Sequence, residues 1–171
     1  MSAPVSGYDR LLLHYGENKD KPWQDWLEFA TTFPKPGKQG LVGLLSCKDE
    51  SVPEKYIYKI SQYINYLVQH ESTIMDGLNN LIPYCPHFCK GIGTFTCEIN
   101  PKCRREGNPF RIDGMKVQKE VMLCEYIDNS TKFYNYIRAP DKVSEEVLYS
   151  TVKQVLLATA MAQRSQRFTH Y

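Results

Sequence analysis

The amino-acid sequence predicts an α+β fold, in which strands interrupted by one helix precede a second group of helices. The clearest strand covers residues 55–61, where large apolar residues occupy alternate positions. Residues 65–78 carry apolar side chains at helical spacing. Residues 144–166 form the longest helical pattern, which has an apolar stripe and begins with Ser144, a residue that favours a helix N-terminus. Shorter β-type runs lie within residues 88–99 and 121–127. This order favours a sheet with one inserted helix, followed by helices alone.

Length and composition are those of an ordinary globular protein. The chain has 171 residues, of which 42% are hydrophobic and 23% are charged. This length can bury a core without a disulfide or metal staple. The net charge of +2 gives no sign of a nucleic-acid or membrane partner, so we expect neither. The longest uncharged apolar stretch, residues 41–47, is too short to span a bilayer.

The first residues show neither the positive region nor the apolar region of a secretory signal. A reducing, cytoplasmic setting is therefore the expected location. In that setting the six cysteines are expected to be mostly free thiols.

The chain divides into three predicted parts. Residues 1–34 form an N-terminal extension that contains a short helix opening at Pro22, whose aromatic face is expected to pack on the main body. Residues 35–127 contain the predicted sheet and its helix. Residues 128–171 contain the remaining helices, the first of which is favoured by polar residues at 129–131.

A glycine-spaced segment follows the prolines that end the extension. Gly37, Gly40 and Gly43 are three residues apart. Glycine lets a backbone approach a ligand closely, and the amides of such a turn can point at phosphate oxygens. The alternative interpretation is a tight hairpin that binds nothing.

Lys59 and Glu71 form a candidate ion pair. Lys59 lies in the predicted strand, on the face opposite Tyr58. The alternative interpretation of Lys59 is a residue of an edge strand whose ammonium simply reaches water. Glu71 lies four residues after Leu67 and three before Ile74, which places it on the apolar stripe of the predicted helix. A carboxylate there is costly unless a cation pairs with it, and Lys59 is the nearest candidate. The alternative is a solvated Glu71 at the border of the stripe.

These features resemble the small lobe of the protein kinases, an antiparallel sheet plus one helix. The phosphate-binding loop of that family has the pattern G-x-G-x-x-G-x-V. Gly40, Gly43 and Leu45 match its later positions, whereas Lys38 stands at the first glycine position, one step from Gly37. The resemblance implies that this loop covers the phosphates of ATP.

The following strand resembles the lysine strand of the same family, written V-A-I-K. Tyr56-Ile57-Tyr58-Lys59 occupies the corresponding positions. The resemblance implies that Lys59 contacts the α and β phosphates and that Glu71 positions it.

The apolar run ending at Ile127 resembles the fifth strand and hinge of the kinase small lobe. The resemblance implies that Cys124 is the gatekeeper and that Glu125 and Ile127 offer backbone groups to adenine. It also implies that Leu45 and Ile57 form the roof of the adenine pocket. The alternative is a plain core strand without a ligand.

His170 and Tyr171 resemble the first two positions of the kinase motif H-R-D-L-x-x-x-N. Tyrosine at the second position is similar to kinase-like proteins of large DNA viruses, which would place the protein in host cytoplasm or the virion. The resemblance implies a Ser/Thr-type protein kinase that transfers the γ-phosphoryl of Mg-ATP to a protein substrate. Residues 128–171 would be the hinge and first helices of a truncated large lobe. The catalytic aspartate and magnesium ligands would follow Tyr171, so we expect no catalysis from these residues alone.

Five further residues suggest zinc as a competing interpretation. Thiolate and imidazole ligands suit that metal, and the candidates are Cys85, His87, Cys89, Cys97 and Cys103. Their spacing does not form paired C-x-x-C knuckles, so buried free cysteines are the favoured interpretation and we expect no metal site. Two other functions stay open, a non-catalytic interaction module and a small-molecule kinase of related fold.

Overall fold

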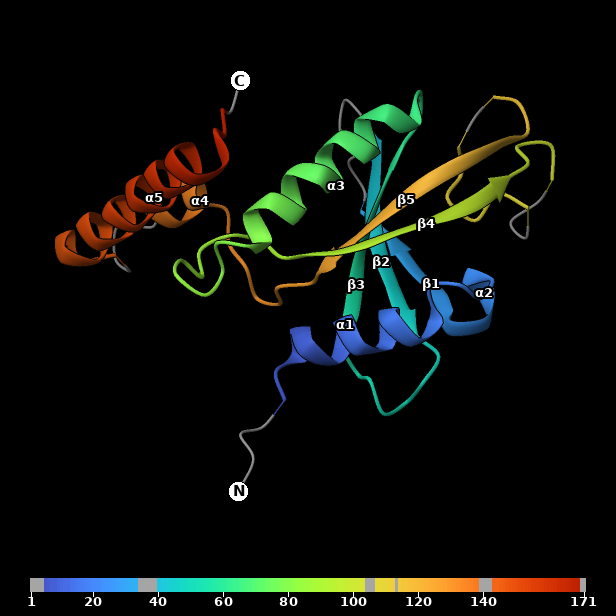
Figure 1. Cartoon of the computed structure of the whole chain (residues 1–171), viewed down its shortest axis with the longest axis horizontal. Coiled ribbons are helices and arrows are strands. Elements are labelled where there is room, and N and C mark those ends of the chain that lie inside the picture. The colour runs from blue at the N-terminus through green and yellow to red at the C-terminus, as the bar shows by residue number, and fades with distance from the viewer. Residues whose placement is uncertain (1–4, 34–39, 104–106, 113, 139–142, 170–171) are drawn as a thin grey trace. The chain divides into compact units, whose positions relative to one another are not determined.

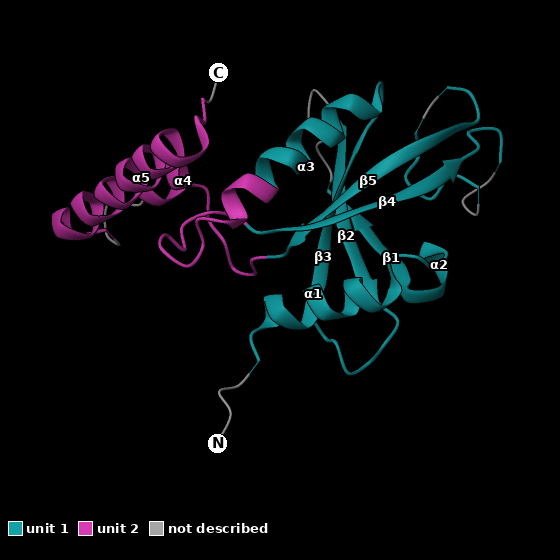
Figure 2. Cartoon of the chain, viewed as in Figure 1, with its two compact units in different colours: residues 1–75, 90–126 teal, residues 76–89, 127–171 magenta. Residues whose placement is uncertain are grey.

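A computed structural model describes residues 5–33, 40–103, 107–112, 114–138 and 143–169. The chain forms two compact units (Figure 2). The first contains residues 1–75 and 90–126, and the second contains residues 76–89 and 127–171.

A five-stranded antiparallel sheet forms the centre of the first unit, with the strand order β1-β2-β3-β5-β4. Its strands are β1 (Leu27–Thr32), β2 (Gly40–Cys47), β3 (Lys55–Ser61), β4 (Gly91–Ile99) and β5 (Val117–Glu125). The α+β class and the strand at residues 55–61 are therefore confirmed.

Helices lie on both sides of this sheet (Figure 1). One side is covered by α1 (Gly7–Asn18) and α2 (Trp23–Trp26), and the other by α3 (Asn65–Asn79). The larger core lies on the α1 and α2 side, where Trp23, Tyr58 and Phe110 are buried. The rings of Tyr58 and Phe110 meet edge to face at a centroid distance of 5.0 Å.

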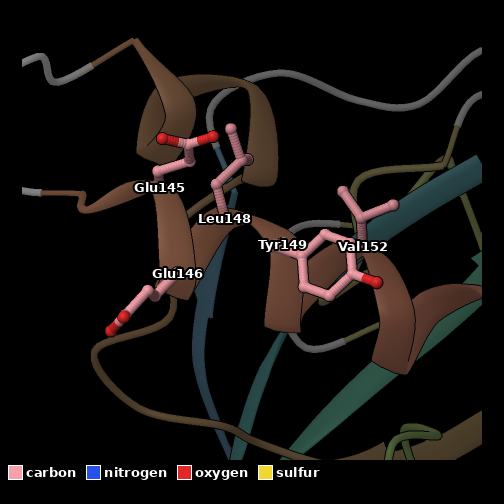
Figure 3. Close-up of a pocket in the computed structure, with 5 residues that line it drawn as sticks. All are labelled: Glu145, Glu146, Leu148, Tyr149 and Val152. Atoms are coloured by element: carbon pink, nitrogen blue, oxygen red, sulfur yellow. The ribbon is translucent and has the colours of Figure 1, made fainter.

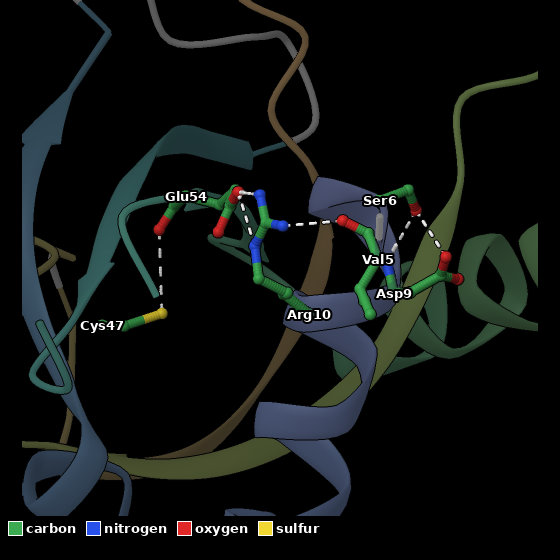
Figure 4. Close-up of polar contacts among 6 residues, drawn as sticks. All are labelled: Val5, Ser6, Asp9, Arg10, Cys47 and Glu54. Atoms are coloured by element: carbon green, nitrogen blue, oxygen red, sulfur yellow. Dashed lines mark hydrogen bonds and ion pairs between the residues drawn. The ribbon is translucent and has the colours of Figure 1, made fainter. Parts of the chain in front are cut away.

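Polar contacts fix α1 to the sheet. The hydroxyl of Tyr8 donates to the carbonyl of Gly91 at 3.1 Å, and the hydroxyl of Tyr15 donates to the carbonyl of Thr94 at 2.8 Å. Figure 4 shows a further link between α1 and the β2–β3 connection. There Arg10 forms an ion pair with Glu54, whose carbonyl also accepts from the Cys47 thiol at 3.7 Å. Such contacts make α1 part of the first unit.

This arrangement corrects the predicted N-terminal extension. Residues 1–34 were expected to precede the sheet, whereas Leu27–Thr32 is its first strand and pairs with β2. The helix that opens after Pro22 ends at Trp26, because Leu27 is already extended and lies opposite Cys47. A boundary after residue 34 would separate two hydrogen-bonded strands.

The second unit contains α4 (Phe133–Ile137) and α5 (Glu145–Gln166). Ser144 caps α5 as its sequence predicts, accepting a hydrogen bond from the backbone N–H of Val147 at 3.3 Å. Helix α4 is shorter than predicted. Residues 129–131 were expected to favour its start, whereas it begins at Phe133. Among the described helices none combines the length and apolar character needed to cross a membrane.

Candidate functional site

Lys59 lies in the middle of β3, between two paired strands. It is opposite Val42 of β2 and Met122 of β5. Alternation along β3 directs it to the face covered by α3, away from the buried Tyr58. Its side chain keeps 29% of its surface exposed. A central position therefore fixes the backbone of Lys59 while its ammonium still reaches solvent.

Glu71 of α3 forms an ion pair with Lys59, so the pairing predicted from the sequence is present. The Glu71 side chain is 37% exposed, which places it at the border of the apolar stripe. A partly hydrated pair of this kind adds little to stability by itself. Its main consequence is geometric, because it holds the ammonium at one place beside the sheet.

The start of α3 is anchored to β5, which positions Glu71. Lys119, which is only 3% exposed, donates to the carbonyls of Gln62 and Tyr63 at 3.2 and 2.9 Å. The side-chain Nδ2 of Asn65 donates to the carbonyl of Gln118 at 3.1 Å. These bonds fasten the short connection between β3 and α3 at its middle and its end.

Apolar residues continue the Lys59 face of the sheet. Cys124 lies opposite Ile57, and Met122 lies opposite Lys59. Both Met122 and Cys124 are buried together with Val68 of α3. Ile57 packs against this cluster and is partly exposed. The structure thus brings Lys59, Ile57 and Cys124 to one face, whereas sequence analysis did not identify Met122 or Val68.

Leu45 does not belong to this face, which corrects its predicted place in the adenine roof beside Ile57. It lies opposite Tyr56 and is fully buried in the core on the α1 side. Successive strand residues face opposite sides, so the face that carries Ile57 and Lys59 receives Leu44 and Val42 instead. The run 41–45 is apolar at most positions, and its pattern therefore could not identify the inward residues.

Packing within the sheet accounts for Gly43. A Cβ atom at Gly43 would overlap the carbonyl oxygen of Thr31 and lie 2.6 Å from Cε1 of Tyr58. Gly40 is similarly enclosed, since a Cβ there would overlap the carbonyl of Ile60. Close backbone approach thus requires glycine at both positions, with or without a bound phosphate.

The remaining predicted site residues lie at the ends of these elements or outside the described residues. Glu125 ends β5, and its carboxylate accepts from the backbone N–H of Lys90 at 3.0 Å. Ile127 belongs to the second unit, where its side chain is exposed. Gly37 and His170 lie outside the residues that the structure describes.

The six cysteines form no disulfide, and they are spread over several strands and connections. In the part of the chain that the structure describes, no three His, Cys, Asp or Glu side chains are grouped so that they could hold a metal ion. Burial raises the pKa of the Cys47 thiol to about 12 and that of Cys97 to about 11. Such thiols stay protonated at neutral pH and are poor metal ligands or nucleophiles.

The second unit has its own surface hollow, along the first turns of α5 (Figure 3). It has a volume of about 520 Å³, and apolar side chains of Leu148, Tyr149 and Val152 line it beside Glu145 and Glu146. Tyr149 is two-thirds exposed. The apolar stripe predicted for residues 144–166 is therefore largely exposed along these turns.

Comparison with known proteins shows a distant viral relative. No protein-family model matches the chain. The chain is similar to Uncharacterized protein 038R of Invertebrate iridescent virus 3, with 25% identity over 127 residues. The similarity covers 72% of this chain and 23% of the viral protein, so the chain spans less than a quarter of that relative's length. This agrees with the viral part of the resemblance, and the kinase part stays a prediction.

Proposed function

We propose that the first unit is a nucleotide-binding small lobe of protein-kinase type, in which Lys59 binds the phosphates of ATP. The observation that carries the proposal is the ion pair between Lys59 and Glu71. It joins the central strand of an antiparallel sheet to the one helix inserted between β3 and β4. The resemblance implies this arrangement for the lysine strand and its partner helix.

The available donors and the exposure of the Lys59 ammonium suit a phosphate ligand. An ammonium has three donors, and the pair with Glu71 leaves others available. Its side chain is still partly exposed, so an anion could reach it without unfolding the lobe. The carboxylate of Glu71 would restrain the long lysine side chain and so lower the entropy lost on binding.

Apolar residues next to Lys59 supply a surface suited to an adenine ring. Val42, Ile57 and Cys124 come from three neighbouring strands and share the Lys59 face. If Gly40 is taken as the last glycine of G-x-G-x-x-G-x-V, Gly37 is the middle glycine and Val42 stands at the valine position. This alignment replaces the one that ended at Leu45, and it agrees with the strand register.

Magnesium is outside this proposal. The described residues contain no grouping of carboxylates that fits a metal ion. We therefore assign to these residues the binding of ATP and no part of phosphoryl transfer, for which metal ligands and a positioned base are required.

Thermal unfolding with and without ATP tests the proposal. Lys59→Met removes the phosphate contact, and Lys55→Met makes the same chemical change at an exposed position of the same strand. A ligand at about 100 times its Kd stabilises a protein by about 2.7 kcal/mol. For a chain of this size that corresponds to a rise in Tm of about 5–10 °C.

We expect this rise in the wild type and in Lys55→Met, and its loss in Lys59→Met. A Tm that ATP leaves unchanged in all three proteins would contradict nucleotide binding, provided that each is folded by circular dichroism. An equal rise in Lys59→Met would show that ATP binds elsewhere.

A second candidate function is a non-catalytic interaction module. The exposed side chains of Leu148, Tyr149 and Val152 on α5 favour it, because a contiguous apolar surface of this kind commonly contacts another protein segment. An absence of any ATP effect, together with concentration-dependent association that Leu148→Glu abolishes, would favour this candidate.

A further inference from the structure

Strand β4 is one edge of the sheet, and part of that edge is blocked by α1. The hydroxyl of Tyr15 donates to the carbonyl of Thr94 at 2.8 Å and accepts from its N–H at 3.2 Å. Both backbone groups of Thr94 therefore point away from β5. Tyr8 occupies the carbonyl of Gly91 in a similar way. These tyrosines prevent another strand from pairing with the first half of β4.

The second half of β4 has the same orientation without this cover. Register with β5 is regular from Thr94 to Ile99. In an antiparallel pair the backbone groups alternate in direction, so those of Thr96 and Glu98 point outward like those of Thr94. Both residues are exposed, and the carbonyl of Glu98 also accepts a weak hydrogen bond from the Cys97 thiol at 3.6 Å. The edge ends at Asn100, whose N–H donates to the carbonyl of Gly107 at 2.6 Å.

A groove of about 480 Å³ runs beside these outward groups. Its lining includes Thr96 and Glu98 on the strand and two aromatic side chains, those of Trp23 and Phe95. These two rings are stacked, with centroids 5.8 Å apart. Both rings are largely buried, so the groove combines a strand edge with a small aromatic floor and a mostly polar lining.

The charge of this groove is positive in balance. Lys19 and Lys21 line it, and the Lys21 ammonium donates to the side-chain oxygen of Asn18 at 2.7 Å. Its acidic member, Glu98, is in an ion pair with Lys116 at 2.6 Å. Two lysines therefore favour an occupant that carries carboxylates.

We propose that this groove binds an extended, acidic segment of a partner protein, which adds a short strand to β4 beyond Tyr15. The segment would exchange backbone hydrogen bonds with Thr96 and Glu98 and place carboxylates near Lys19 and Lys21. A second copy of the chain is a poorer occupant. Pairing through the same edge would bring the lysines of both copies together, and like charges would repel.

Binding of a defined peptide tests this proposal on the whole chain. The probe is acetyl-Glu-Val-Glu-Val-Glu-Val-amide, which alternates carboxylates with apolar side chains. Its counterpart with Lys in place of Glu tests charge, and a version with N-methylated valines tests backbone pairing. Binding is measured by calorimetry and by the shifts of the Thr96 and Glu98 amide signals in NMR spectra.

Two substitutions at one position separate backbone from side chain. Thr96→Pro removes an outward N–H, a change that edge strands accept, and Thr96→Val keeps that N–H. Loss of one backbone hydrogen bond is expected to weaken binding of the Glu peptide about tenfold in Thr96→Pro. Binding to Thr96→Val should equal that of the wild type. The double substitution of Lys19→Glu and Lys21→Glu should weaken binding of the Glu peptide at least as much as Thr96→Pro does.

The expected result also includes no binding of the Lys peptide and weakened binding of the N-methylated peptide. Equal affinity for the Glu and Lys peptides would overturn the proposal, as would equal affinity for the N-methylated version. The same conclusion follows if the Glu peptide does not bind, or if the free protein dimerises and Thr96→Pro abolishes the dimer. The N-methylated peptide tests backbone pairing on the wild type, so the result does not depend on the folding of Thr96→Pro.

Discussion

His14 of α1 and Tyr56 of β3 are buried against each other, with Nδ1 of His14 2.9 Å from the Tyr56 hydroxyl oxygen. That hydroxyl donates to the carbonyl of Leu11 at 2.8 Å, so we infer that His14 donates its Nδ1–H to Tyr56. The contact joins α1 to the strand that carries Lys59. Helix α1 lies outside the part of the chain in which the sheet was predicted, yet it supports the strand of the candidate site.

Acid should weaken this junction. Burial lowers the pKa of His14, and the nearby Asp49 and Glu17 only partly oppose that effect. The unfolded chain, with a histidine pKa of about 6.5, then binds more protons than the folded chain. Stability from neutral His14 is present above about pH 6.5 and is lost as pH falls toward the lower folded pKa. The free energy of unfolding, measured by urea at several pH values, should therefore fall below about pH 6.5.

Substitutions of two histidines make this test specific. His14→Gln removes the buried titrating ring, and His70→Gln changes an exposed histidine of α3. The pH dependence should be reduced in the first variant and retained in the second. A wild-type profile in both variants would show that His14 does not cause the acid sensitivity.

Gly43→Ala should strongly destabilise the first unit. The added Cβ would overlap the carbonyl of Thr31 and press on the ring of Tyr58. Overpacking of this kind costs about 1–3 kcal/mol or more. Gly16→Ala is the matched control, since open space surrounds that position of α1 and alanine favours a helix. If urea midpoints of the two variants were equal, the close packing of β2 against β1 would be disproved.

Leu45 and Val42 should respond differently to truncation. Leu45→Ala removes a fully buried side chain and should cost about 2–5 kcal/mol. Val42 is only partly buried, so Val42→Ala should cost less. If the first unit binds ATP as proposed, Val42→Ala should also reduce the thermal stabilisation by ATP. Denaturation and ATP titration of both variants distinguish the two faces, and the reverse ranking of stability would contradict the register.

Lys119→Met should loosen the start of α3. It removes the donor to the carbonyls of Gln62 and Tyr63 and leaves them without that partner. A lost buried hydrogen bond of this kind costs about 1–3 kcal/mol. Lys116 directly precedes β5 and is mostly exposed, so Lys116→Met should change stability far less. Hydrogen exchange of the α3 amides should rise in Lys119→Met alone, and equal rates in both variants would refute the anchoring role.

Alkylation should separate the thiols by their surroundings. Cys47 is half-buried, and burial raises the pKa of its thiol to about 12. Only the thiolate reacts rapidly, so iodoacetamide at pH 8 should modify the exposed Cys89 and Cys103 well before Cys47. Mass spectrometry of peptides at successive times gives the order. Rapid labelling of Cys47 in the folded protein would show that its surroundings open readily.

Local patterns were sufficient for the clearest elements. Alternation predicted β3 at its observed bounds, and helical spacing with a serine cap predicted α5. The same spacing placed Glu71 beside the strand that carries Lys59, and the ion pair is present. Each inference needed only residues within one element and a short connection.

Where the sequence pattern was uniform, the prediction failed. Residues 41–45 are mostly apolar, so a shift of one residue in register could not be detected, and Leu45 was placed on the face that belongs to Val42 and Leu44. Similarly, Leu27–Thr32 was not recognised as a strand because its short alternation follows directly from the helix at Trp26.

Short-range patterns were enough to predict the α+β class, the bounds of β3 and the pairing of Glu71 with Lys59. Contacts between distant residues, by contrast, made α1 and β1 part of the first unit, required glycine at position 43 and anchored α3 through Lys119. The physical reason is the range of the interactions. Periodicity and capping act within a few residues, whereas strand pairing, close backbone approach and the burial of a lysine depend on residues far apart in the chain.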